Sequence, residues 1–160
     1  MFRKGVEEYW ADSGYSGTYG YTDYPMANWQ AEEWVSLGLL HSALDALIPG
    51  YIHRYIPDVS FVADNVPIVL NGSVVTVMGT SIAAPCWAGV WALVDQNYAA
   101  INGVELSSPA PEVIYTVANN TQVAPAFTDQ SSGSPAPYYE RIGFGSPDVY
   151  NLVNDVAQLY

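Results

Sequence analysis

The sequence of 160 residues has few basic side chains, one cysteine and no long apolar run. Four Lys and Arg stand against 16 Asp and Glu, a net charge of −12, which argues against a nucleic-acid partner because phosphate contacts need basic side chains. The single cysteine, Cys86, excludes an internal disulfide and a cysteine-based zinc site. No stretch of about eighteen apolar residues predicts a transmembrane helix, and MFRKGVEEYW lacks the apolar core of an export signal.

Half of the residues are apolar, and five Trp and thirteen Tyr are among them, which is enough for one domain with a core. We expect one domain over residues 1–160, because no internal repeat or linker divides the chain. The acidity suits low pH, where carboxylates are protonated and self-repulsion falls, but it also suits simple solubility at neutral pH. Two sequons, at Asn71 and Asn119, are compatible with secretion.

Hydrophobic periodicity and turn residues predict the secondary structure. Two β-branched runs, 68–70 and 74–77, flank Asn71-Gly72 and predict a β-hairpin. We expect a short strand after residues 57–60 and loops over 12–25 and 120–147. Helices are expected over 29–48, 82–101, 107–118 and 148–159. The second of these helices is apolar all round as far as Val94, which predicts that it is buried on most faces.

Gly79-Thr80-Ser81 lies between the predicted hairpin and the helix that follows it. A nucleophilic serine needs a tight turn that exposes its hydroxyl, backbone N–H groups that hold an oxyanion, and a helix dipole behind it. A serine that merely caps the N-terminus of a core helix would stand at the same place. These three residues alone leave both interpretations open.

The longer segment GTSIAAPCWAGVWAL resembles the G-T-S-x-x-x-P element of subtilisins and of sedolisins, the serine-carboxyl peptidases. Cys86 stands where subtilisins usually have His. Other segments resemble sedolisins in order and spacing: Glu8-Tyr9-Trp10, Tyr24-Pro25 with Trp29-Gln30, Pro57-Asp58-Val59-Ser60 before IVLNGSVVTV, Phe127-Thr128-Asp129, and Gly143-Phe144-Gly145-Ser146-Pro147-Asp148. The resemblance covers the C-terminal half of a catalytic domain. It implies a partial α/β fold with a subtilisin-like parallel sheet flanked by helices.

The resemblance also implies the chemistry. Ser81 corresponds to the catalytic serine, and Gly79 and Thr80 form the nucleophile loop beside it. In the family a Glu on a helix takes the serine proton, an Asp four residues later orients that Glu, and another Asp completes the oxyanion hole. Carboxylate bases suit acid pH, where His is already protonated. The implied substrates are peptides or proteins, in an extracellular or lysosomal-type acidic compartment.

The three family carboxylates belong to the half of the domain that would precede Met1. We therefore expect the 160 residues alone to be inactive, with the N-terminal half as an implied partner. Half of such a domain exposes apolar sheet edges and helix faces, which predicts poor solubility, oligomerisation or dependence on a partner. The alternative function is a truncated, non-catalytic relic or a binding module.

Several titratable residues offer other assignments. Glu8 and Asp12 have the i, i+4 spacing of the dyad, but the resemblance places them on a strand and loop. We expect Asp58 and Asp64 to be structural turn residues. The two histidines, His41 and His53, are too few and too badly placed for a Ser-His-Asp arrangement.

Two departures from the family lie close to the implied chemistry. Met78 replaces the first Gly of Gly-Gly-Thr-Ser, and we expect it to crowd the strand or change the backbone. In the calcium tail, Asp129 and the Gln130 carbonyl can serve as ligands, and the two glycine positions fall on prolines. Tyr139 replaces the final Asp, so the calcium site implied by the resemblance is degraded, since calcium prefers six to eight oxygens and several charges.

Overall fold

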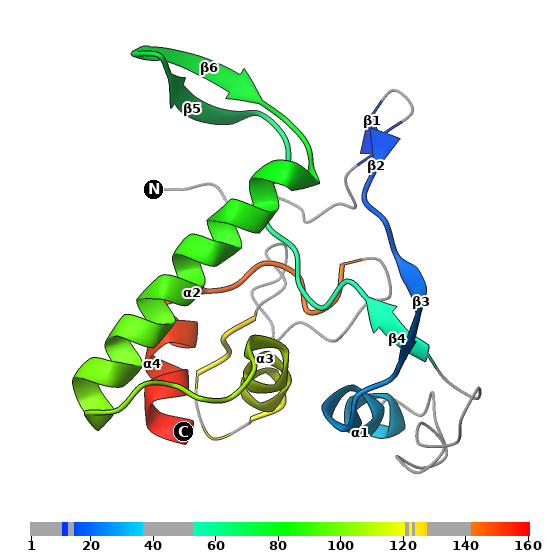
Figure 1. Ribbon diagram of the computed structural model, residues 1–160, viewed down its shortest axis with the longest axis vertical. Coiled ribbons are helices and arrows are strands. Elements are labelled where there is room, and N and C mark those ends of the chain that lie inside the picture. Colours follow the sequence, from blue (N-terminus) through cyan, green and yellow to red (C-terminus); the bar gives the residue numbers. More distant parts are fainter. Residues whose placement is uncertain (1–10, 13–14, 37–52, 121, 123, 128–141) are drawn as a thin grey trace.

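The computed structural model describes residues 11–12, 15–36, 53–120, 122, 124–127 and 142–160. Within them the chain is a mixed α/β protein with four helices and three two-stranded antiparallel sheets (Figure 1). The helices are α1 (Asn28–Ser36), α2 (Thr80–Asn102), α3 (Ala110–Ala118) and α4 (Val149–Leu159). The paired strands are β1 (Ala11–Asp12) with β2 (Tyr15–Ser16), β3 (Gly20–Pro25) with β4 (His53–Ile56), and β5 (Val66–Leu70) with β6 (Ser73–Val77).

The long helix α2 and the C-terminal helix α4 lie side by side, with α3 next to them (Figure 1). Together with Phe127 and Phe144 they enclose the main hydrophobic core. The side chain of Asn97 donates to the Val153 carbonyl at 3.0 Å, which ties α2 to α4 through a polar contact as well. Among the helices that the structure describes, none is long and apolar enough to cross a membrane.

A smaller core joins α1 to the β3–β4 pair and consists of Met26, Ala31, Trp34 and Tyr55. The buried side chain of Gln30 hydrogen-bonds to the backbone of Tyr55, whose partner in the strand register is Tyr21 of β3. Its Nε2 donates to the Tyr55 carbonyl and its Oε1 accepts from the Tyr55 N–H, both at 2.9 Å. This amide satisfies both backbone groups of a buried residue and thereby fixes α1 against β4.

The β5–β6 hairpin extends past the N-terminal end of α2 (Figure 1). Its turn is Asn71-Gly72, and both residues have positive φ, 51° and 78°, as a type I′ turn requires. The predicted hairpin is therefore confirmed. The predicted helices over 107–118 and 148–159 are confirmed as α3 and α4, and Asp148 caps α4 by accepting from the Asn151 N–H at 3.0 Å.

Two expectations about local structure are wrong. Residues 20–25 form β3 and not a loop, because β4 pairs with them from about thirty residues further along the chain. Residues 57–65 contain no strand. The backbone of this segment hydrogen-bonds to the turn at 142–145 instead of to a strand. The Ser60 N–H donates to the Gly145 carbonyl at 3.0 Å, and the Phe144 N–H donates to the Asp58 carbonyl at 2.8 Å.

Three further expectations concern longer segments. The helix expected over 29–48 is described as α1 as far as Ser36, and residues 37–48 lie outside the described residues. The expectation that α2 is buried on most faces is wrong, because only Val90, Val94 and Tyr98 are buried along it. Every strand pair among the described residues is antiparallel, so the structure supports the α/β class, and the described part of the chain contains no parallel sheet.

Candidate functional site

The junction between β6 and α2 consists of two residues, Met78 and Gly79. Gly79 has φ 119° and ψ 157°, a conformation that side-chain-bearing residues rarely adopt. A Cβ there would meet nothing nearer than the Ser81 nitrogen at 3.9 Å, so the backbone angle and not lack of space requires glycine. Met78 is 55% exposed, so the expected crowding by its side chain is absent.

Ser81 is the second residue of α2 and is exposed. The N-cap position belongs to Gly79 and no side chain caps the helix, so the interpretation of Ser81 as an N-cap is wrong. The N–H groups of Thr80 and Ser81 have no carbonyl within the helix to bind, and they lie at the positive end of its dipole. A hydroxyl, free N–H groups and a helix dipole therefore coincide, as a nucleophile beside an oxyanion site requires.

The segment 58–63 supports this junction. The Ala63 carbonyl accepts from the Gly79 N–H at 2.7 Å, which holds the turn from one side. The Ser60 carbonyl accepts from the Trp87 indole Nε1 at 2.8 Å, and Trp87 is about 1.7 helical turns after Ser81. The Ser60 hydroxyl in turn donates to the Ile142 carbonyl at 2.8 Å. These bonds fix the N-terminal end of α2 relative to the turn at 142–145.

Asp58 begins that segment and is the centre of a polar network. Its Oδ1 accepts from the Tyr115 hydroxyl at 3.0 Å, and Arg54 forms an ion pair with Oδ2. The Tyr115 hydroxyl accepts from Gln30 Nε2 at 2.9 Å, and the Arg54 guanidinium lies 4.7 Å from the centre of the Trp29 ring. This network joins α1, β4 and α3 and gives Asp58 a structural role.

The sequence analysis missed Arg54 and Tyr115 as members of the network. One signal was present for Arg54, which is one of only four basic residues and follows His53 shortly before Asp58. Nothing local marked Tyr115, which lies 57 positions away from Asp58. Asp64, the other aspartate of this region, is exposed and accepts from the Asn65 side chain at 2.9 Å.

Among the described residues, none hydrogen-bonds to the Ser81 hydroxyl, so no base is paired with it there. His53 lies at the start of β4. Glu8 and His41 lie outside the described residues, as do the expected calcium ligands Asp129 and Gln130. Elsewhere in the described part of the chain, no three potential ligands gather in a metal-binding group.

Two carboxylates are buried at other places. Burial raises the pKa of Glu33 in α1, and a hydrogen bond from Asn119 only partly opposes this. Burial also raises the pKa of Asp155 in α4, and the negative charge of Asp148 adds to the effect. One oxygen of each carboxylate has no partner among the described residues. Both environments favour the neutral acid, so they suit low pH.

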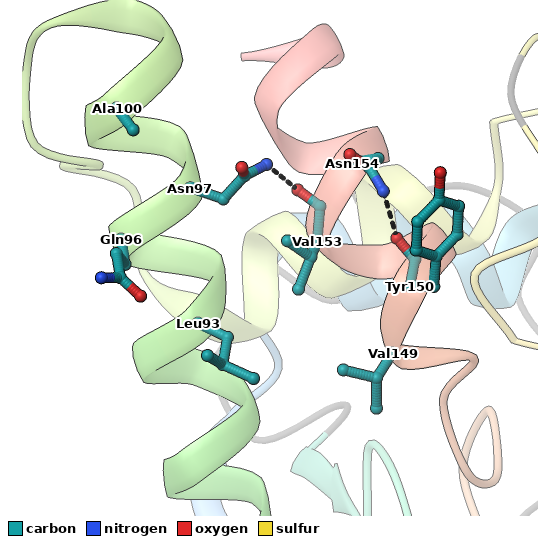
Figure 2. A pocket seen from close by; sticks show the side chains of 8 residues that line it. All are labelled: Leu93, Gln96, Asn97, Ala100, Val149, Tyr150, Val153 and Asn154. Atoms are coloured by element: carbon teal, nitrogen blue, oxygen red, sulfur yellow. Dashed lines mark hydrogen bonds between the residues drawn. The ribbon is translucent and has the colours of Figure 1, made fainter.

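A groove of 420 Å³ lies between α2 and α4, and Figure 2 shows its lining. Leu93, Val149 and Val153 supply apolar surface, while the amides of Asn97 and Asn154 donate to α4 carbonyls. Leu93 is twelve residues after Ser81, or about 18 Å along the helix at 1.5 Å per residue. The groove is therefore separate from the serine.

No family model matches this chain, and no curated protein matches it. The sedolisin resemblance therefore depends on the motif residues themselves.

Proposed function

We propose that this chain is the serine-bearing half of a serine-carboxyl peptidase of the sedolisin type, with Ser81 as nucleophile. The observation that carries the proposal is the junction of β6 and α2, where Gly79, with its positive φ, places an exposed serine in the first turn of a long helix. The motif G-T-S-x-x-x-P predicts this geometry, and the finding that Ser81 caps nothing removes its simplest structural explanation.

The proposed chemistry is acyl transfer from a peptide. The Ser81 Oγ attacks the peptide carbonyl carbon while its proton passes to a carboxylate base, and the N–H groups beside it stabilise the oxyanion. The amine leaves with a proton, and water then hydrolyses the ester. In this proposal the base, the oxyanion Asp and the parallel sheet of a subtilisin-like fold all come from the complementary half of the domain. No role is assigned to calcium, because the tail offers too few carboxylates.

Two observations support a missing complementary half and an acidic setting. The first half of α2 bears no charged residue, yet Ala84 and Ala88, which lie one turn apart on the same face, are exposed. Small apolar residues on an exposed helix face are typical of a surface that packs closely against another element. The raised pKa values of Glu33 and Asp155 mean that these two groups contribute more stability at acid pH than at neutral pH. A carboxylate base suits the same range, because it can still accept a proton where His is already protonated.

The test begins with the native transcript and the intact mass of the native protein. We expect the reading frame to extend upstream into a helix with Glu and Asp four residues apart. In that longer protein, Ser81→Ala should abolish peptide cleavage at acid pH, whereas Ser73→Ala, which changes another exposed serine, should leave it unchanged. The 160 residues alone should not cleave peptides. If they do, and if Ser81→Ala abolishes that cleavage, the proposal that the catalytic carboxylates come from a complementary half is wrong.

The alternative is a non-catalytic relic or binding module, and the observation that favours it is the absence of a base for Ser81 among the described residues. The same experiment separates the two functions. A native protein that begins at Met1 and fails to cleave peptides with any added partner would establish the alternative.

A further inference from the structure

We infer that the outer edge of β6 is a self-association surface, through which two copies of this chain pair as antiparallel strands. The inference does not depend on the chemistry assigned to Ser81. Among the described residues, β5 and β6 pair only with each other, so each has one edge without a strand partner. An isolated two-stranded hairpin is marginally stable in water, and a third strand stabilises it.

The register of the hairpin decides which backbone groups point outward. The two-residue turn makes Leu70 and Ser73 a hydrogen-bonded pair, so hydrogen-bonded pairs recur at every second position along the ladder. The pairs between them, Pro67 with Thr76 and Val69 with Val74, direct their backbone groups away from the hairpin. We call these outward-facing backbone groups the outer row of each strand. On β6 the outer row is complete, because Val74 and Thr76 each offer an N–H and a carbonyl.

On β5 the outer row is interrupted, because Pro67 has no N–H to donate. Proline on an edge is one of the devices by which proteins prevent strand addition. The hairpin therefore has one blocked edge and one open edge. This asymmetry limits association to two chains: a second copy covers β6, and the resulting four-stranded sheet ends on β5 at both sides.

The side chains of the hairpin suit a second copy better than a charged partner. Residues 66–77 include no ionisable side chain, and charged residues, the other usual protection of an edge, are therefore missing from β6. Val69 is 74% exposed and Val74 is 73% exposed, so both apolar side chains face water in the single chain. Pairing of two identical uncharged strands brings no unpaired charge into the interface.

A two-fold axis at Val75, the midpoint of β6, uses the outer row fully. Val74 then exchanges hydrogen bonds with Thr76 of the partner subunit, and Thr76 does so with Val74 of the partner subunit. Val75 faces Val75 of the partner subunit as a non-hydrogen-bonded pair, in which Cα atoms approach to about 4.5 Å. Such an isologous contact closes on itself.

Proline substitution tests the edge without removing a hydrogen bond of the hairpin. Thr76→Pro deletes an outward N–H of β6, and Val69→Pro deletes an outward N–H of β5. Light scattering during gel filtration of the full chain should give twice the chain mass for the wild type and for Val69→Pro. Thr76→Pro should give the single chain mass. A monomeric wild type, larger open-ended oligomers, or dissociation by Val69→Pro and not by Thr76→Pro would overturn the inference.

A cross-link provides a second measurement that does not depend on the proline variants. In a Cys86→Ala background, Val75→Cys should form an intermolecular disulfide under mild oxidation, because the expected Cα separation suits one. Val69→Cys in the same background is the matched control and should stay reduced. Cross-linking through Val69→Cys but not through Val75→Cys would place the contact elsewhere and refute the pairing.

Discussion

Tyr115→Phe tests whether the network around Asp58 stabilises the fold. The substitution removes only the hydroxyl of a side chain that is 2% exposed. That hydroxyl donates to Asp58 Oδ1 at 3.0 Å and accepts from Gln30 Nε2 at 2.9 Å. Gln30 Nε2 keeps the Tyr55 carbonyl at 2.9 Å, so the main loss is the bond to the carboxylate.

The magnitude follows from that bond. Hydrogen bonds to charged groups contribute about 1.5–3 kcal/mol, and the Arg54 ion pair that Asp58 retains places the expected loss near 2 kcal/mol. At about 2–4 °C per kcal/mol for a chain of this size, Tm should fall by about 4–8 °C. Thermal unfolding followed by circular dichroism near pH 6 measures this shift.

The matched control is Tyr150→Phe, which removes the hydroxyl of a side chain that is 78% exposed. It should change stability by no more than about 0.5 kcal/mol. Equal Tm values for wild type and Tyr115→Phe would refute the reasoning that the network stabilises the fold. Equal losses in both tyrosine variants would show that burial of the hydroxyl is irrelevant.

Three other predictions address the turn, the buried acids and the metal. Gly143→Ala places a Cβ 1.9 Å from the Asp58 carbonyl oxygen and should lower the free energy of unfolding by about 4 kcal/mol or more. The control is Gly103→Ala, which shares the positive φ but has open space, and it should cost about 1–2 kcal/mol. Urea unfolding of both variants measures the difference. Because burial raises the pKa of Glu33 above its ordinary value of 4.5, the folded state binds the extra proton, and the free energy of unfolding should fall as pH rises through and above 4.5. Glu33→Gln should therefore raise Tm at pH 7 and leave it nearly unchanged at pH 3. The control Glu32→Gln changes an exposed residue and should leave Tm unchanged at both pH values. A Tm for Glu33→Gln at or below the wild-type value at pH 7 would contradict the predicted direction of the effect. Addition of EDTA or of calcium should leave Tm unchanged, and a calcium-dependent rise of several degrees would show that the degraded tail still binds the ion.

Much of the secondary structure followed from short-range chemistry. Asn71-Gly72 predicts the hairpin because a type I′ turn needs two positive φ angles, and the structure has them. The amphipathic pattern over 148–159 predicts α4, and the structure adds that the Asp148 carboxylate caps it by accepting from the Asn151 N–H. Gly79 marks the junction before Ser81 for the same kind of reason, a backbone angle that other residues avoid.

The errors arose where a distant segment decides the outcome. β3 is a strand because β4 pairs with it, and its Gly- and Tyr-rich sequence has no period that predicts this. The burial of α2 was overestimated because apolar composition does not say how many neighbours a helix has, and here α3 and α4 cover only one side. No described residue hydrogen-bonds to the Ser81 hydroxyl, so the proposed base has to come from outside the described part of the chain.

The turn angles, the helix start at Asp148 and the acidity of the chain belong to the sequence alone, because each depends on one residue or its immediate neighbours. The tertiary structure decided the rest. It joined Tyr115 to Asp58 and buried Glu33, and among the described strands it left the outer edge of β6 without a partner. The physical reason is that desolvation and hydrogen-bond partners depend on which distant groups meet, and only the folded chain brings them together.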